Sequence, residues 1–403
     1  MRTLILWALL VPSLAGMPAK IELTCVDDNA TGYGTFQSHN QKVLANANGI
    51  FMTHVRTRNE AYTAQQWRLS RSTDAGKTFT TVHEATHATH PPAIETDEDG
   101  NVYLVRSDLT TGDAFLHVFR AEDDYRKERV TPIPGSAAQK FSLLYDRGRK
   151  QLYYASYNRF DVIGLDGKVI RSLQLFRNGK NAEMQYPHLS LDPGGTLHFA
   201  WTSVPFGKMT YRSIHVVRSP DGGATWQNAD GSPLAPPIVA DDSGPAVRAN
   251  LDDELGASNW LSSFRARGGK GHFLYMSTLN PPRQHYVRYD LKTGKRELDI
   301  TPKFKGEAIE LLGLDGFFAA SEPTLYCVGH TIDGRIGCLA SGDNGTTWRD
   351  HAVSEKVEHL YAVGGCREVT RDGFVIGSFT TASNTDGRGV SKVYFLRIPT
   401  APR

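Results

Sequence analysis

An eight-residue motif with the pattern Ser-x-Asp-x-Gly-x-Thr-aromatic occurs three times in the chain, at residues 72–79, 219–226 and 341–348. In each copy the aspartate can accept hydrogen bonds from the backbone of its own turn, and the glycine can take the positive φ that a tight turn needs. The threonine and the aromatic residue then begin the next strand. Three copies far apart in one chain indicate an internal repeat. We expect each copy to cap a hairpin and to take no part in chemistry.

Strand–turn–strand patterns occur seven times along the chain. Each unit has an alternating apolar run, a glycine-containing turn and a second apolar run, as β-hairpins do. The sixth hairpin is expected at residues 324–336 and the seventh at residues 368–376. Intervals of roughly fifty residues between turn glycines suit one four-stranded propeller blade per unit. These glycines are Gly49, Gly100, Gly148, Gly194, Gly269, Gly334 and Gly373.

The repeats predict an all-β fold, a seven-bladed β-propeller formed by a single domain over residues 20–403. A six-bladed ring is the alternative if the third or the seventh unit is misread. We expect the three Asp-containing turns on the outer rim, away from the central channel. The formal net charge is +2, and the charges are mixed along the chain. This balance argues against a nucleic-acid partner.

Residues 1–15 have the pattern of a signal peptide. Arg2 gives the positive n-region, Leu4–Leu10 form an apolar run, and small residues follow at Ser13 and Ala15. The run is too short to span a bilayer. We therefore expect a secreted or periplasmic monomer that makes no contact with a membrane.

Four cysteines fit an oxidising compartment. Cys327 and Cys338 could face each other across a hairpin, and Cys25 and Cys366 could join the two ends of the chain. Both pairings are hypotheses.

The residues just before the first strand of each unit should meet at one mouth of the channel, because the innermost strands of a propeller line it. These segments are rich in histidine, tyrosine and lysine. Polar, aromatic and titratable side chains of this kind are what a carbohydrate site needs. Together with nearby arginines, they give the candidates for substrate binding: Asn40, His90, Lys140, His188, Arg248, Trp260, Arg265, Glu322 and Tyr361.

His83, His87 and His90 suggest a zinc site. Their spacing matches no reliable zinc motif. We therefore expect a loop of solvated histidines, with no metal and no cofactor.

Several stretches resemble the BNR-repeat family that includes ulvan lyases, within the sialidase-like superfamily. Residues 37–40, 49–54 and 67–72 resemble its opening, in which a His-Asn pair precedes the first blade strand and a second histidine follows the hairpin. Tyr186-Pro187-His188 and residues 211–234 also resemble that family. These matches cover about a third of the chain, in patches.

Ulvan lyases of this family look like seven-bladed propellers that cleave uronate-containing polysaccharides by β-elimination. The resemblance therefore implies an acidic polysaccharide or glycan as substrate, with His39 and Tyr186 as base and acid candidates and His54 beside them. An arginine should neutralise the uronate carboxylate and so acidify the C5 proton. The family pattern places this arginine where the chain has residues 201–203, Trp-Thr-Ser. Arg212 is the nearest substitute, and Arg248 or Arg265 would serve from the next unit.

Two other functions stay open. A sialidase-like exo-glycoside hydrolase needs three clustered arginines, an aspartate acid and a tyrosine nucleophile with a glutamate partner. The Arg-Ile-Pro sequence typical of sialidases near the start of the propeller lies here at residues 397–399, at the far end. The remaining alternative is a non-catalytic propeller that binds carbohydrate with the same residues.

Overall fold

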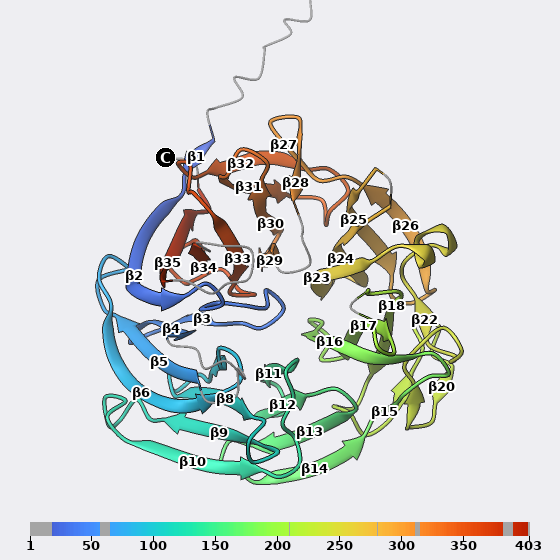
Figure 1. Cartoon of the computed structure of the whole chain (residues 1–403), viewed down its shortest axis with the longest axis horizontal. Coiled ribbons are helices and arrows are strands. Elements are labelled where there is room, and N and C mark those ends of the chain that lie inside the picture. Colours follow the sequence, from blue (N-terminus) through green and yellow to red (C-terminus); the bar gives the residue numbers. More distant parts are fainter. Residues whose placement is uncertain are drawn as a thin grey trace, which may run out of the picture.

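The computed structural model describes residues 18–56, 65–208, 210–279, 281–310, 315–381 and 390–401, which form β-sheets arranged around a common centre (Figure 1). Strand pairing gives seven sheets of four or more strands and one two-stranded sheet. Within these ranges the one helical segment is the 3-10 turn Asp252–Gly256. The prediction of an all-β propeller is confirmed. No helix in the described ranges has the length and apolar character needed to cross a membrane.

The first three sheets follow one another in the chain, each with four consecutive antiparallel strands. The first contains β3 (Val43–Asn46), β4 (Gly49–Val55), β5 (Gln65–Ser72) and β6 (Thr80–Ala88). The second contains β7 (Ala93–Thr96), β8 (Val102–Asp108), β9 (Asp113–Phe119) and β10 (Glu128–Ile133). The third contains β11 (Ser142–Asp146), β12 (Gln151–Ala155), β13 (Arg159–Gly164) and β14 (Val169–Gln174).

The next two sheets flank the long insertion. The fourth contains β16 (Ala182–Leu191), β17 (Leu197–Pro205), β18 (Ile214–Ser219), β19 (Trp226–Gln227), β20 (Pro233–Leu234) and β22 (Val247–Arg248). The two-stranded sheet pairs β15 (Phe176–Arg177) with β21 (Ile238–Val239). The fifth contains β23 (Asn259–Arg267), β24 (Lys270–Ser277), β25 (Arg283–Asp290) and β26 (Lys295–Ile300).

The last two sheets include strands from the beginning of the chain. The sixth contains β29 (Phe317–Ser321), β30 (Thr324–Thr331), β31 (Ile336–Ser341) and β32 (Arg349–Val353), extended by β1 (Ala19–Lys20), β27 (Lys303–Phe304) and β28 (Glu307–Glu310). The seventh contains β33 (Leu360–Gly365), β34 (Phe374–Thr381), β35 (Val390–Pro399) and β2 (Glu22–Thr31). Because β2 pairs antiparallel with β35, an N-terminal strand completes the sheet formed by the C-terminal strands and closes the ring.

Five of the seven predicted hairpins join the first and second strands of a sheet, but the last two were misplaced. The sixth predicted hairpin is β30–β31, which joins the second and third strands of its sheet. The first strand, β29, was missed because the turn that joins it to β30, Ser321–Thr324, contains Pro323 and no glycine. The seventh sheet begins with β33. The residues 368 and 369, which were expected in its first strand, lie in the connection between β33 and β34, where Glu368 forms an isolated bridge with Ala320.

The three Asp-containing turns have the predicted hydrogen bonds. In the second copy, the amides of Ala224 and Thr225 donate to Oδ1 of Asp221 at 3.1 and 2.8 Å, and the Thr225 hydroxyl donates to Oδ2 at 2.7 Å. The amide of Gly223 donates to the Ser219 hydroxyl at 2.7 Å. The other copies repeat this arrangement around Asp74 and Asp343.

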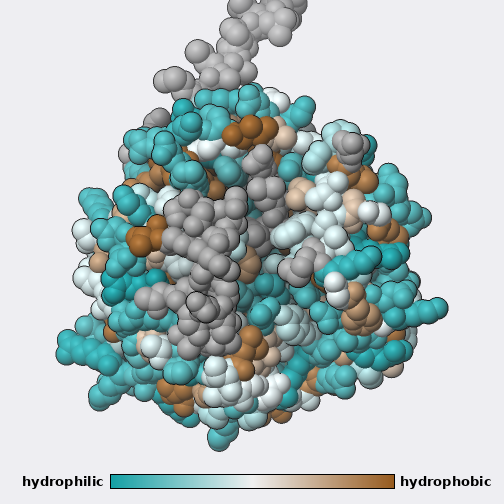
Figure 2. Space-filling view, viewed as in Figure 1, coloured by the Kyte–Doolittle hydropathy of each residue, from teal (hydrophilic) through white to brown (hydrophobic). Residues whose placement is uncertain are grey.

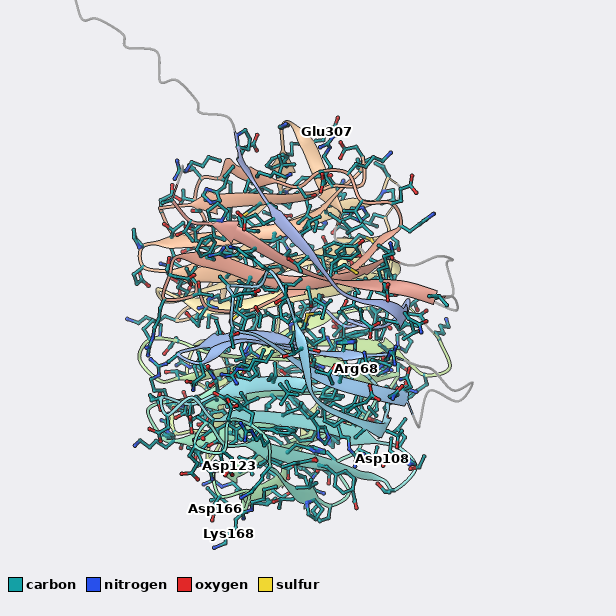
Figure 3. The ribbon with its side chains drawn as sticks, turned by 90° about the vertical axis from the view of Figure 1, so that its left-hand side faces the viewer. Arg68, Asp108, Asp123, Asp166, Lys168 and Glu307 are labelled. Atoms are coloured by element: carbon teal, nitrogen blue, oxygen red, sulfur yellow. The ribbon has the colours of Figure 1, made fainter. Side chains whose placement is uncertain are left out.

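These turns lie on the face of the ring opposite the starts of the first strands. Successive strands of a sheet are antiparallel, so their connections alternate between the two faces. In Figure 3, Asp108, at the end of a second strand, lies on the opposite side from Asp123 and Asp166, which belong to third-to-fourth connections. The Asp-containing turns are also third-to-fourth connections. They are therefore away from the channel mouth, as predicted.

The cores lie between neighbouring sheets. Between the third and fourth sheets, for example, Phe160 packs edge-on against Trp226, with ring centres 5.3 Å apart. Figure 2 shows mainly hydrophilic residues on the face seen in Figure 1, with the hydrophobic ones in small separate groups.

Neither proposed disulfide is formed, since all four cysteines are free thiols. Cys327 and Cys338 lie on adjacent strands but face Leu339 and Val328, so they are not opposed. The expected signal peptide, residues 1–15, lies outside the described residues.

Candidate active site

Three of the predicted site residues lie ring to ring. His39 comes before β3, and Tyr186 and His188 lie on β16. The centre of the His39 ring is 5.2 Å from that of Tyr186, with the planes 78° apart, and 5.2 Å from that of His188. Nε2 of His39 lies 3.1 Å from the carbonyl oxygen of Phe141, just before β11. The first, third and fourth sheets therefore meet at His39.

Tyr186 lies at an irregularity in β16. The pairing of β16 with β17 shifts in register between Gln185 and His188, and Tyr186 has a φ of 51°. This left-handed conformation is unfavourable for a bulky side chain. Such strain persists only where the surrounding structure fixes it, and it is concentrated at functional sites.

The loop that carries His39 is fixed by a buried lysine. The Lys42 ammonium donates to the carbonyl oxygen of Gln37 and, at 2.7 Å, to that of Asn40. The side-chain amide of Gln37 donates to the carbonyl oxygen of Gln139 at 2.8 Å. Burial, and then the charge of Arg367, lowers the pKa of Lys42 to about 7. The loop is therefore held from both sides, which orients the His39 ring.

Burial keeps the central rings uncharged. Burial, followed by the nearby His188, Lys42 and Lys140, holds the pKa of His39 well below its usual 6.5, although the hydrogen bond to Phe141 acts in the opposite direction. Burial also lowers the pKa of His188 to about 3. For Tyr186, burial and then the neighbouring Tyr211 raise the pKa well above 10. Near neutral pH the site thus offers a neutral imidazole and a neutral phenol, which can accept and donate a proton respectively.

The Tyr186 ring is surrounded by further aromatic and cationic groups. The Tyr211 ring lies 5.2 Å from it and contacts the Trp260 ring at 4.4 Å. The two tyrosine hydroxyls are 3.4 Å apart. The Lys140 ammonium lies 5.0 Å from the centre of the Tyr186 ring and 4.8 Å from that of Phe36.

The same series of contacts continues to the opposite side of the mouth. The His90 ring lies 5.0 Å from that of Phe36, and the Tyr33 ring lies 5.0 Å from Phe36 and 5.8 Å from Tyr361. Burial, and then the charges of Lys140 and Lys42, keeps the pKa of His90 well below 6.5. Predicted residues from the first, second, third, fourth, fifth and seventh sheets are therefore connected around the channel.

Sequence reasoning missed Tyr211, Phe36 and Lys42. Tyr211 lies in the connection between the second and third strands of its sheet, which reaches the same face as the starts of the first strands. A search of both kinds of connection would have found it. No sequence signal identifies Phe36 or Lys42. In the sequence, Phe36 cannot be told from an ordinary core phenylalanine, and Lys42 cannot be told from an ordinary surface lysine.

His54 belongs to a different network. Its Nε2 lies 3.1 Å from Oδ2 of Asp27 on β2, and Nη1 of Arg68 lies 3.1 Å from the same oxygen. This contact joins the first sheet to the strand that closes the ring. No contact joins His54 to His39 or Tyr186 among the described residues.

The three candidate arginines already have anionic partners. Arg212 and Arg248 both approach Asp242, at 3.1 and 3.7 Å, and Arg248 also contacts Asp252. Arg265 lies 2.7 Å from Glu368.

The two remaining candidates lie at opposite extremes of exposure. Glu322 pairs with Arg267 at 2.8 Å and is largely exposed. Asn40 is 1% exposed, and both atoms of its side-chain amide have no hydrogen-bond partner among the described residues.

A small cavity of about 20 Å³ lies beside His39 and His188, and its lining includes Ser38, Gln41 and Arg367. It has room for about one water molecule.

The described residues contain no group of three or more histidine, cysteine or acidic side chains arranged to hold a metal ion. His83 and His117 instead share Glu128, which each contacts through a ring nitrogen. His83 and His87 lie on β6 and His90 is buried, so the expectation of a loop of solvated histidines was wrong.

Comparison with known proteins supports the same fold. Residues 136–296 match the model of the BNR repeat-containing family. A solved PL25 ulvan lyase bound to -[GlcA(1-4)Rha3S]- is similar with a TM-score of 0.66 at 10% identity, covering 92% of this chain and 94% of that chain. The polysaccharide lyase Uly1 gives a TM-score of 0.59 at 11% identity, covering 95% and 100%.

Likeness at this level of identity establishes the fold alone. The WD40 repeats of RRP9 also match, with a TM-score of 0.51 at 10% identity, covering 94% of this chain and 98% of that chain. No curated protein matches the chain significantly. The resemblance expected from the sequence is confirmed: the chain contains a segment similar to the BNR repeat-containing family within a propeller that is similar in fold to ulvan lyases.

Proposed function

We propose that this protein is a polysaccharide lyase that cleaves a uronate-containing polysaccharide by β-elimination. The observation that carries the proposal is the buried pair of His39 and Tyr186, with ring centres 5.2 Å apart at the channel mouth. The pair supplies an uncharged base and an uncharged acid at one place. The likeness to ulvan lyases agrees with this chemistry.

The hydrogen bond of His39 assigns its tautomer. The Phe141 carbonyl oxygen can only accept, so Nε2 of His39 carries the proton and donates to it. Nδ1 then has the free lone pair and acts as the base. It takes the C5 proton of the uronate while the bond between C4 and the bridging oxygen breaks, and a C4–C5 double bond forms.

Tyr186 completes the reaction. When the Tyr211 hydroxyl donates to the Tyr186 hydroxyl, the proton of Tyr186 remains free for the leaving oxygen. The raised pKa of Tyr186 keeps this proton in place until the oxygen departs. Product release and a return proton transfer from His39 to solvent and then to Tyr186 would restore the starting state.

Two features weigh against the hydrolase alternative. A sialidase-like site needs three clustered arginines, whereas Arg212 and Arg248 share Asp242, and Arg265 pairs with Glu368 elsewhere. We further propose that the seven sheets of four or more strands are seven blades, as in a lyase-like ring, with a six-bladed ring as the alternative.

The proposal is tested by exposing the purified protein to a panel of acidic polysaccharides and following the absorbance of unsaturated uronate. We expect His39→Ala and Tyr186→Phe each to lower turnover at least about a hundredfold, the scale of positioned acid–base catalysis, while circular dichroism stays unchanged. Sugar release without that absorbance would favour a hydrolase, and binding without any cleavage would favour a carbohydrate-binding propeller. Near-normal activity of both variants would exclude the assigned roles.

A further inference from the structure

Lys140 is a buried cation that has no anionic partner in the part of the chain that the structure describes. It precedes β11 and is 8% exposed, and the contacts of its ammonium are the rings of Phe36 and Tyr186. Among the described residues, no carboxylate pairs with this ammonium and no carbonyl oxygen accepts a hydrogen bond from it.

The other cations nearby do not share this property. Lys42 donates to two carbonyl oxygens, and Arg367 pairs with Glu95 and donates to the Leu143 carbonyl oxygen at 2.7 Å. A buried charge is costly unless it is paired and hydrogen-bonded. Two ring faces compensate only part of that cost. Lys140 is therefore arranged for an anion that comes from outside the chain.

We propose that Lys140 binds and neutralises the carboxylate of the uronate at the cleavage point, the role that the resemblance would give to an arginine. The inference rests on the proposed lyase function. It identifies a catalytic residue that replaces the arginine missing at residues 201–203. Arg212, Arg248 and Arg265 are less suited, because each already has a carboxylate partner.

The position of Lys140 fits this role. A carboxylate oxygen in a charge-assisted hydrogen bond lies about 2.8 Å from the ammonium nitrogen. The C5 carbon is bonded to the carboxylate carbon, so it would lie near the Tyr186 ring, whose centre is 5.0 Å from the Lys140 ammonium and 5.2 Å from the centre of the His39 ring. The positive charge would thus stabilise the carbanion-like charge that develops as the C5 proton leaves.

Burial lowers the pKa of Lys140 to about 7. This predicts that the binding of a uronate is coupled to the uptake of a proton. The free protein loses the charge as pH rises above 7, whereas a bound carboxylate would favour the charged form. Binding at pH 8 should therefore take up a proton. The affinity for a uronate should also fall as pH rises from 7 to 9.

The test uses two tetrasaccharides, one that contains glucuronate and one in which each carboxyl is reduced to a hydroxymethyl group. Binding is measured by calorimetry in a Tyr186→Phe background, so that cleavage does not interfere. We expect the parent protein to prefer the glucuronate form at least about tenfold, the value of one modest charge-assisted contact. Adding Lys140→Met should remove both the preference and the proton uptake at pH 8, whereas Lys140→Arg should keep the preference without that uptake.

Lys168→Met is the matched control, because Lys168 is exposed on the opposite face (Figure 3). It should leave the preference unchanged. Thermal unfolding provides a separate readout: Lys140→Met should be as stable as the parent or more stable, since it removes an unpaired buried charge, whereas a purely structural cation–π role would make it less stable.

The inference is overturned if the parent does not prefer the glucuronate tetrasaccharide, or if the Lys140→Met protein keeps the preference. These outcomes are separate from the fate of the proposed function. Loss of the carboxylate preference with no unsaturated product would leave Lys140 as a recognition residue in a protein that is not a lyase. The opposite outcome is an unsaturated product that depends on His39, together with a preference for glucuronate that persists in Lys140→Met. It would support the lyase function and exclude Lys140 as the group that binds the carboxylate.

Discussion

Replacing Asp27 with asparagine should weaken the closure of the propeller. Asp27 lies on β2, the strand that completes the seventh sheet, and its side chain is 4% exposed. Its Oδ2 lies 3.1 Å from His54, 3.3 Å from Arg56 and 3.1 Å from Arg68. The substitution would leave these groups of the first sheet without their shared carboxylate.

The magnitude follows from the pKa of Asp27. Burial alone would raise it, but hydrogen bonds from His54 and from the Asn29 amide, with the charges of His54 and Arg56, lower it from 3.8 to about 2. At about 1.4 kcal/mol per pKa unit, the difference amounts to about 2.5 kcal/mol. The two arginines are partly in water, which screens the interaction, so we expect about 1 to 2 kcal/mol. Because the folded-state pKa is depressed, this stability is fully present above about pH 4 and is lost as the pH falls towards 2.

The assay is urea unfolding followed by tryptophan fluorescence at pH 7 and pH 3, for the wild type and for Asp27→Asn. Asp28→Asn is the matched control, because Asp28 is the next residue on β2 and is exposed. We expect Asp27→Asn to be less stable than the wild type at pH 7, with the gap reduced to about half at pH 3, and Asp28→Asn to stay within about 0.5 kcal/mol. An equal or larger gap at pH 3, or no gap at pH 7, would refute the electrostatic closure.

Two further predictions concern a turn and the catalytic base. Gly223→Ala should lower the free energy of unfolding by at least about 2 kcal/mol more than Gly112→Ala, measured by urea unfolding. Both glycines have positive φ, but a Cβ at Gly223 would lie 2.3 Å from the Phe160 ring, whereas nothing lies within 4 Å of a Cβ at Gly112. Equal losses of unfolding free energy in the two variants would contradict this reasoning. The acid limb of kcat/KM on the cleaved polysaccharide should lie below pH 6, because His39 must be neutral and its pKa is held well below 6.5. An acid limb centred at or above pH 6.5 would show that another group is the base.

The sequence was sufficient for the features that depend on local hydrogen bonding and local backbone conformation. The turn around Asp221 is satisfied by residues within four positions of the aspartate, so its motif can be read directly from the chain. The same holds for hairpins whose turns contain a glycine. The tight turn at Pro323 was not predicted, because it forms without a glycine.

The site was predicted in part, for a topological reason. In a propeller the starts of the first strands meet at one mouth, so His39, Lys140 and Tyr186 could be expected together although they are far apart in sequence. Tyr211 was not predicted, because it arrives from the other connection on the same face and not from the start of a first strand.

Only the tertiary structure decided which charged groups are already paired. His54 lies on β4, the second strand of the first hairpin, and its ring contacts Asp27 on the strand that closes the propeller. Arg212 has Asp242 as its partner, whereas the Lys140 ammonium contacts only aromatic rings among the described residues. The state of an ionisable group depends on burial and on charges a few ångströms away. Those neighbours come from distant parts of the chain, so no local sequence pattern specifies them.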